Sequence, residues 1–125
     1  MAWPPQVGEL LPHAEEAIGV QDKLVGYSLN ESHGRGGPKA RGFALILGIT
    51  VESIDYLSAA IYTGIRQHPI KAVATKKPYG FHCVVEIPLH GVGSYSHRVA
   101  TLRTVWELGG PLRPPRLISA FPRPR

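Results

Sequence analysis

Hydrophobic residues recur at helical spacing in the middle of the chain. The pattern predicts a first helix over 39–47, which begins beside Pro38 and ends at Gly48. It predicts a second helix after Thr50, a good N-cap, with Pro69 as its stop. The apolar residues of this second helix recur three or four positions apart: Ile54, Leu57, Ile61 and Ile65. Each helix therefore offers one face to a core.

Beyond Pro69 the pattern changes to alternation, which is typical of strands with one buried face. We predict strands over 71–76, 79–89, 97–108 and 116–121, the last closed by Pro122. In the third of these, Thr104 shares a face with apolar residues, whereas Arg103 lies on the opposite face. Helices followed by an antiparallel sheet of about four strands indicate an α+β fold.

The segments before the first helix have weaker signals. Residues 23–29 have weak strand character, and residues 30–38 form a polar, glycine-dense stretch that we expect to be an irregular loop. We therefore expect an N-terminal arm over 1–20, a single α+β domain over 21–122 and a basic tail over 123–125.

The composition is that of an ordinary globular domain. The chain has 125 residues, of which 43% are hydrophobic, enough for one core. Its longest apolar run, over 43–49, is far shorter than the roughly 20 residues of a membrane-spanning helix. With no secretion signal at the start and Cys83 as the single cysteine, we expect a cytoplasmic protein without a disulfide or membrane contact.

The positive charge is concentrated at the C-terminal end. Residues 1–96 carry as many acidic as basic side chains, so the net charge of +5 comes from the last part of the chain. Six arginines and the single acid Glu107 lie there: Arg98, Arg103, Arg113, Arg116, Arg123 and Arg125. Arginine suits bidentate contact with phosphate or carboxylate, so RNA and an acidic protein are both candidate partners.

Two clusters could carry chemistry. The loop from His33 to Lys39 includes Arg35 and three glycines before a helix, an arrangement that can present N–H groups to an anion. The loop is not a Walker A motif, and a tight turn with a capping histidine is the structural alternative. The second cluster is a polar face of the hairpin with His82 on one strand and Arg103 on the next, which can hold an RNA backbone or simply be solvated.

Metal and nucleophilic chemistry have little support in the sequence. The six histidines are scattered, no zinc or magnesium ligand spacing occurs, and we expect no metal and no cofactor. Cys83 is expected to pack in the core. RNA can be cut without a metal because its 2′-hydroxyl is the nucleophile, and His, Lys, Arg and Ser side chains suffice to move protons and stabilise the phosphorane.

Three stretches resemble a bacterial domain family of uncharacterised activity. They read Tyr-Ser-Leu-Asn over 27–30 with His33, Gly36 and Lys39-Ala40, then Arg-Thr-Val-Trp over 103–106, then Pro-Arg-Leu-Ile-Ser-Ala-Phe-Pro over 115–122. Members of that family look like toxins of two-gene modules or C-terminal toxin modules. The resemblance implies a bacterial toxin held in check by a small acidic antitoxin or immunity protein.

The closing Ser-Ala-Phe-Pro also resembles the ending of toxins with the barnase, EndoU, colicin and RelE-like ribonuclease fold. That resemblance implies two helices before a four-stranded sheet, and a catalytic set of His33, Lys39, Arg103 or Arg98, and Ser119. We therefore expect a metal-independent endoribonuclease with His33, Lys39, Arg103 and Ser119 as catalytic residues. The expected RNA-binding residues are Arg35, His82, Arg98, Thr104 and Arg116.

Two alternatives stay open. A non-catalytic basic module could bind nucleic acid or an acidic partner protein, and an enzyme could act on a small phosphorylated ligand at the glycine loop. The nuclease hypothesis needs His33 and Lys39 to lie over the exposed side of the C-terminal strands, close to the arginines.

Overall fold

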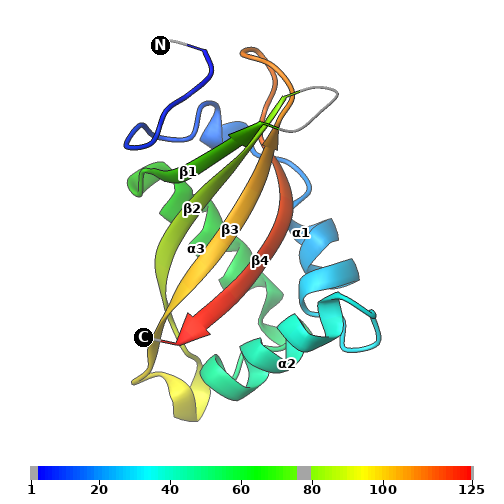
Figure 1. Ribbon diagram of the computed structural model, residues 1–125. Helices are drawn as coiled ribbons and strands as arrows, with labels where there is room; N and C mark the ends of the chain where they lie inside the picture. The colour runs from blue at the N-terminus through cyan, green and yellow to red at the C-terminus, as the bar shows by residue number, and fades with distance from the viewer. Residues whose placement is uncertain (1–2, 76–79, 125) are drawn as a thin grey trace.

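Four antiparallel strands form a meander in the order β1-β2-β3-β4, and the helices cover one face of this sheet (Figure 1). This is the arrangement in the computed structural model, which describes residues 3–75 and 80–124. The strands are β1 (Ile70–Thr75), β2 (Phe81–His90), β3 (Val99–Leu108) and β4 (Arg116–Pro124). The predicted α+β fold, with helices before the sheet, is confirmed.

The two main helices are α2 (Gly36–Leu47) and α3 (Ile54–Gln67), close to the predicted bounds. Gly48 follows α2 in the left-handed conformation, φ 67°, and its N–H bonds the carbonyl of Ala44. The Thr50 side chain accepts a 3.3 Å hydrogen bond from the Glu52 N–H at the start of the 3₁₀ turn η3 (Val51–Ser53), which leads directly into α3.

The predicted alternation along the central strands is confirmed. Leu102, Thr104 and Trp106 point to the helices and are fully buried, while Arg103 and Glu86 lie opposite each other on the open face. The core lies between this inner face and the buried stripes of α2 and α3, which include Phe43, Leu47, Leu57, Ile61 and Ile65. Burial of these large side chains is the main stabilising contribution to the fold.

Two expectations for the segment before α2 are wrong. Residues 23–28 are helical, not extended, and Leu29 follows in a turn: α1 (Val20–Lys23) continues into a π-helical turn, η2 (Leu24–Ser28). Val20, Leu24 and Ser28 recur every four positions and are all buried, whereas Asp22 is exposed. A helix turns Asp22 away from the other three, but a strand would place all four on one face. The glycine-dense stretch is also partly regular, since α2 already begins at Gly36.

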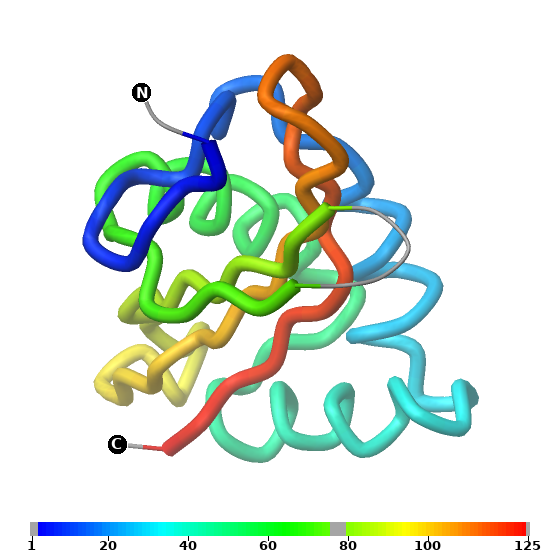
Figure 2. Tube along the Cα trace, turned by 45° about the horizontal axis from the view of Figure 1, so that its top comes forward, coloured from blue at the N-terminus to red at the C-terminus, as the bar shows by residue number. Residues whose placement is uncertain are grey.

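The ends of the chain take part in the packing. Leu11, Ala14 of the 3₁₀ turn η1 (Ala14–Glu16), and Ala17 belong to the core, although the sequence suggested an arm over 1–20. Arg123, which the sequence placed in a basic tail, lies in β4, where it is opposite Thr101 of β3 in the strand register. The strand predictions for Lys76 and Tyr79 lie outside the described residues. Strand β4 is one of the two edge strands of the sheet, and Figure 2 shows it flanked by the segment that contains α1 and α2.

Candidate functional site

A cleft of about 670 Å³ lies between strand β4 and the helical segments α1, η2 and the start of α2. Four cationic side chains line it, Lys23, Arg35, Lys39 and Arg116, together with one carboxylate, Asp22. Its other lining residues are Gly19, Gly26, Tyr27, His33, Leu117, Ile118 and Ser119. The excess of positive charge makes the cleft suited to a polyanion.

His33 is held by the backbone that leads into α2. Its Nδ1 accepts hydrogen bonds from the backbone N–H groups of Arg35, at 3.0 Å, and Gly36, at 2.9 Å. Because both groups are donors, Nδ1 is unprotonated in this arrangement and the ring hydrogen is on Nε2. His33 therefore acts as a cap before the helix and can offer an N–H donor to the cleft. Its Nδ1 is engaged by the backbone and is not open to a substrate in this arrangement.

The same contacts correct the expectation of a free anion-binding loop. The N–H groups of Arg35 and Gly36 are taken by the His33 ring, and the N–H of Gly37 bonds the His33 carbonyl oxygen at 2.7 Å. The backbone donors of Arg35, Gly36 and Gly37 are therefore already satisfied. Anion binding at this end of α2 depends on side chains, which weakens the alternative of a phosphorylated ligand cradled by the glycines.

Lys39 and Tyr27, which both line the cleft, form a hydrogen-bonded pair. Lys39 Nζ donates a 2.7 Å hydrogen bond to Tyr27 Oη, and the pair is half-buried. The His33 ring packs edge-on against the Tyr27 ring, with centroids 4.8 Å apart. Lys39 Nζ also lies 5.6 Å from the centroid of Phe121 on β4. Lys39 thus links the helical wall of the cleft to the sheet.

A glycine lets the start of α2 lie close to η2 within the helical wall. A Cβ at Gly36 would overlap the backbone carbonyl of Tyr27, so the start of α2 can pack against η2 only because residue 36 has no side chain. This close packing sets Tyr27 beside both His33 and Lys39. Gly36 of the glycine-rich stretch therefore serves packing between two helical segments.

Strand β4 supplies the other wall. Ile18 pairs with Arg116 in a short parallel bridge, through a 3.0 Å bond from the Leu117 N–H to the Ile18 carbonyl oxygen. The register then shifts: Trp106 is opposite Leu117, but Val105 is opposite Ser119. The extra residue, Ile118, is a β-bulge, and it places Ser119 on the open face of the sheet although Leu117 points to the core.

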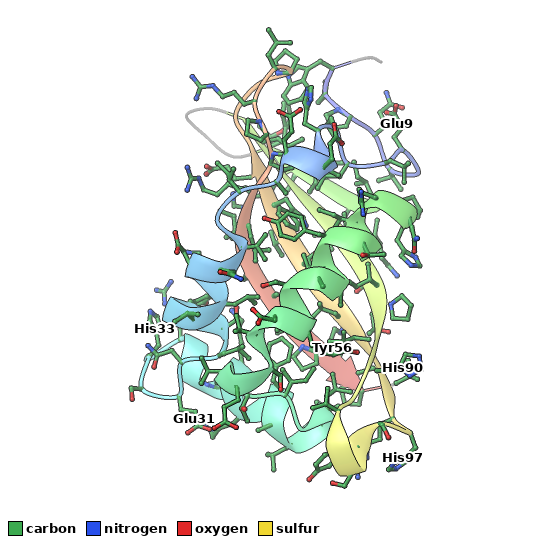
Figure 3. The ribbon with its side chains drawn as sticks, turned by 180° about the vertical axis from the view of Figure 1, so that it is seen from behind. Glu9, Glu31, His33, Tyr56, His90 and His97 are labelled. Atoms are coloured by element: carbon green, nitrogen blue, oxygen red, sulfur yellow. The ribbon has the colours of Figure 1, made fainter. Side chains whose placement is uncertain are left out.

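The structure brings together five of the residues predicted from the sequence. His33, Lys39 and Ser119 of the expected catalytic set line the cleft, with Arg35 and Arg116 of the expected RNA-binding set. Figure 3 shows His33 on the side of the molecule away from His90 and His97. The other four predicted residues lie elsewhere: Arg103, His82, Arg98 and Thr104.

Arg103 belongs to an ion-pair network on the open face of the sheet. Glu86 lies 2.9 Å from Lys71, 3.5 Å from Arg103 and 3.3 Å from Arg123, and its side chain is 13% exposed. The hydrogen bond from Lys71 is the main reason why the pKa of Glu86 is lowered, and the charges of Lys71, Arg123 and Arg103 add to it. His82 is on the same face, opposite Glu107.

Thr104 is a correction to the predicted RNA-binding set. Its side chain is fully buried, Oγ1 donates a 2.7 Å hydrogen bond to the Val85 carbonyl oxygen, and it accepts a 2.8 Å bond from Trp106 Nε1. A residue enclosed in this way cannot contact RNA. Its role is to satisfy the indole N–H inside the core.

Arg98 is also placed away from the cleft. Its guanidinium lies 4.8 Å from the ring centroid of Tyr95 and donates to the carbonyl oxygens of Leu45 and Ile46 in the last turn of α2. A cation at this position satisfies carbonyl groups that the helix leaves without partners. Arg98 is thus a helix-capping residue rather than part of the catalytic set that the resemblance implied.

Three residues of the cleft did not stand out as chemical groups in the sequence: Asp22, Lys23 and Tyr27. They lie on the segment that looked like a weak strand. The four-residue spacing of Val20, Leu24 and Ser28 was the available signal, since a helix there turns Lys23 and Tyr27 to one side.

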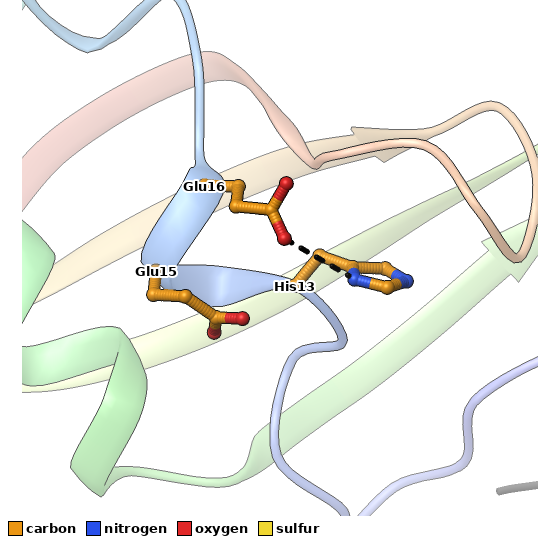
Figure 4. Close-up of side chains that lie close together, drawn as sticks. All are labelled: His13, Glu15 and Glu16. Atoms are coloured by element: carbon orange, nitrogen blue, oxygen red, sulfur yellow. Dashed lines mark ion pairs between the residues drawn. The ribbon is translucent and has the colours of Figure 1, made fainter.

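One group of potential metal ligands occurs in the described part of the chain. His13, Glu15 and Glu16 place ligand atoms within 4.8 Å of one another at η1 (Figure 4). His13 Nδ1 is 3.8 Å from Glu16 Oε1, while Nε2 is 2.8 Å from the carbonyl oxygen of Pro111. Both ring nitrogens thus have protein partners, and the two acids are exposed.

None of the helices in the described ranges is by itself long and apolar enough to cross a bilayer, and only the bent pair Gly36–Leu47 with Val51–Gln67, at 73°, reaches the required length and composition.

The fold and the cleft together define an α+β domain with a cationic site between its outer strand and its N-terminal helices. Residues 10–124 match the family described as "Domain of unknown function (DUF6883)", so the chain belongs to this family. The match supports the resemblance to a family of uncharacterised activity, and it identifies no toxin or ribonuclease family. No curated protein and no solved structure gives a significant match.

Proposed function

We propose that this domain is a metal-independent endoribonuclease toxin that binds RNA in the cationic cleft. The observation that supports this function is the convergence, in one cleft, of four cations, two hydroxyl groups, the Nε2–H of His33 and a single carboxylate. RNA carries its own nucleophile, so these groups are sufficient in kind for cleavage without a metal.

Each group has a role in the proposed reaction. Arg35, Lys39 and Arg116 would hold the phosphate and stabilise the phosphorane. Ser119 and the Nε2–H of His33 would donate hydrogen bonds to its oxygens. Asp22, the one carboxylate among the lining residues, would accept the proton of the 2′-hydroxyl. Arg103 and His82, on the open face of the same sheet, would contact the RNA as it leaves the cleft.

An inhibitor of such an enzyme would have to cover the same cations. We therefore propose a small acidic antitoxin or immunity protein as the partner, with carboxylates that occupy the phosphate positions. This partner follows from the charge of the cleft and from the toxin resemblance of the sequence.

The test is cleavage of a fluorescent single-stranded RNA in EDTA. The wild-type chain should give products with 2′,3′-cyclic phosphate and 5′-hydroxyl ends, and Arg35→Gln/Arg116→Gln should bind RNA more weakly, with a salt dependence reduced by about two phosphate contacts. The control Arg66→Gln/Arg113→Gln removes the same charge outside the cleft lining. Equal effects of the two double variants would reject the cleft as the RNA site.

A non-catalytic RNA-binding module is the second candidate. The capped Nδ1 of His33 favours it, because two backbone N–H groups occupy the ring nitrogen that a general base would need. Salt-sensitive binding confined to the cleft, with intact RNA after long incubation in EDTA, would support this second function. The same result would reject the nuclease.

A further inference from the structure

We propose that Tyr27 is the general acid of the cleft and that Lys39 stabilises the phenolate that forms when Tyr27 gives up its proton. This inference rests on the proposed ribonuclease function. It starts from a problem that the structure raises: cleavage needs a proton for the departing 5′-oxygen, and His33, the obvious source, has its Nδ1 engaged by two backbone N–H groups.

The geometry of Tyr27 fits the role of proton donor. Lys39 Nζ has only hydrogens to give, so in the 2.7 Å bond between them the tyrosine oxygen is the acceptor. The hydroxyl hydrogen of Tyr27 therefore points away from Lys39, and no acceptor within the described ranges takes it. A cleft-lining hydroxyl with a free hydrogen can donate to a bound substrate.

The surroundings of Tyr27 favour the charge that proton donation leaves behind. A phenolate at this position would accept a charge-assisted hydrogen bond from Lys39, and Lys23 Nζ lies 5.4 Å from the ring centroid. The ring is also fixed in place by its edge-on contact with His33 and by the close packing of Gly36 against the Tyr27 backbone. The group is therefore positioned before substrate binds.

The proposed step balances in protons and electrons. The 2′-oxygen forms a bond to phosphorus and its proton passes to the Asp22 carboxylate, while the bond between phosphorus and the 5′-oxygen breaks and the 5′-oxygen takes the Tyr27 proton. The products are a 2′,3′-cyclic phosphate and a 5′-hydroxyl. Asp22 is left protonated and Tyr27 ionised, so transfer of one proton through water restores the starting state.

The experiment uses RNA in which sulfur replaces the bridging 5′-oxygen at one position. A thiolate leaves without protonation, so this substrate does not need a general acid. Tyr27→Phe should cleave ordinary RNA about 10² to 10⁴-fold more slowly than the wild type, which is the usual contribution of a general acid. It should cleave the sulfur substrate at close to the wild-type rate.

The outcomes separate the two proposals. If wild type cleaves neither substrate, the ribonuclease function itself is wrong. If wild type cleaves but Tyr27→Phe is unimpaired, or is slowed equally on both substrates, the general-acid role is overturned. The control is Tyr56→Phe, whose hydroxyl donates to the His90 carbonyl oxygen away from the cleft and whose loss should leave both rates unchanged.

A second variant covers the case in which Tyr27→Phe does not fold. Lys39→Met keeps the Tyr27 ring and hydroxyl but removes the cation that stabilises the phenolate. It should slow cleavage of ordinary RNA by a larger factor than cleavage of the sulfur substrate. Equal factors on the two substrates would contradict the proposed link between Lys39 and proton donation.

Discussion

The ring nitrogen Nδ1 of His33 accepts a 2.9 Å hydrogen bond from the backbone N–H of Gly36, the first residue of helix α2. A side chain that satisfies a free N–H at a helix start contributes about 1 kcal/mol to stability. We expect His33→Ala to lower the free energy of unfolding by about that amount, and His33→Asn to lower it less, because asparagine also caps helices. Urea unfolding checks this, and equal stabilities of all three chains would contradict the capping role.

Gly36 and Gly34 give a matched pair of substitutions in one loop. A Cβ at Gly36 would overlap the Tyr27 carbonyl, whereas a Cβ at Gly34 would meet nothing within 4 Å. Gly36→Ala should therefore destabilise the fold by about 1–3 kcal/mol, as overpacking does. Gly34→Ala should change stability by less than about 0.5 kcal/mol. Thermal unfolding of both variants measures the contrast, and a Gly36→Ala protein as stable as Gly34→Ala would show that the two segments do not pack this closely.

Two substitutions at Thr104 separate the contribution of its buried hydroxyl to stability from that of its methyl group. Thr104→Val leaves the indole N–H of Trp106 without its 2.8 Å acceptor, and an unsatisfied buried donor costs about 1–3 kcal/mol. Thr104→Ser keeps the hydroxyl and loses only a methyl group. We expect Val to be the more destabilising change in denaturant unfolding. The reverse order would mean that packing, not the hydrogen bond, is the main contribution of this residue.

The ion pairs of Glu86 make the free energy of unfolding depend on pH in the acid range. Its pKa is lowered in the folded protein, chiefly by the hydrogen bond from Lys71, so the carboxylate stabilises the fold at pH values above its unfolded pKa of about 4.3. This contribution is lost as the pH falls through the lower, folded pKa. We expect Glu86→Gln to cost about 1 kcal/mol at pH 7, where two of the three cationic partners are largely exposed.

The measurement for Glu86 is the difference in unfolding free energy between wild type and Glu86→Gln at several pH values. The difference should be constant near neutrality and should shrink below about pH 4. Glu107→Gln is the control, since Glu107 is exposed and forms no ion pair in the described structure. A difference that grew on acidification would show that the network opposes folding.

Cys83 is expected to be inert in the folded protein. It is fully buried on the inner face of β2, and burial raises the pKa of its thiol to about 11. Because the thiolate is the reactive form, a thiol-specific reagent at pH 8 should modify the native protein very slowly and the urea-unfolded protein rapidly. Rapid modification of the native chain would place Cys83 at the surface.

The sequence predicted the main elements because their patterns are strong and local. Ile61 and Ile65 recur at helical spacing before Pro69, and the residues around Trp106 alternate without interruption. The segment around Val25 and Gly26 was harder, because a β-branched residue beside glycine resembles a short strand. Its helical form depends on the burial of Leu24 against other elements of the fold. The local sequence indicates this burial only through the four-residue spacing of Val20, Leu24 and Ser28.

The candidate site was predictable only in part for a related reason. His33 and Lys39 are close in sequence and border a distinctive loop, so their proximity could be expected. Arg103 was assigned with them because the resemblance pointed to an arginine in the middle strands, but its strand lies inside the sheet and its guanidinium is paired with Glu86. Tyr27 could not be assigned because its place in the cleft depends on the packing of η2 against α2.

Ile118 makes the number of residues in β4 as important as their identity. With the bulge, Leu117 and Ser119 point to opposite faces of the sheet. If these three residues were paired without the bulge, strict alternation would place Leu117 and Ser119 on the same face, and the segment on one side would exchange its inward and outward side chains. A related chain that kept all three residues but lost the bulge would turn the serine hydroxyl into the core, whereas loss of Ile118 together with the bulge would leave both orientations unchanged.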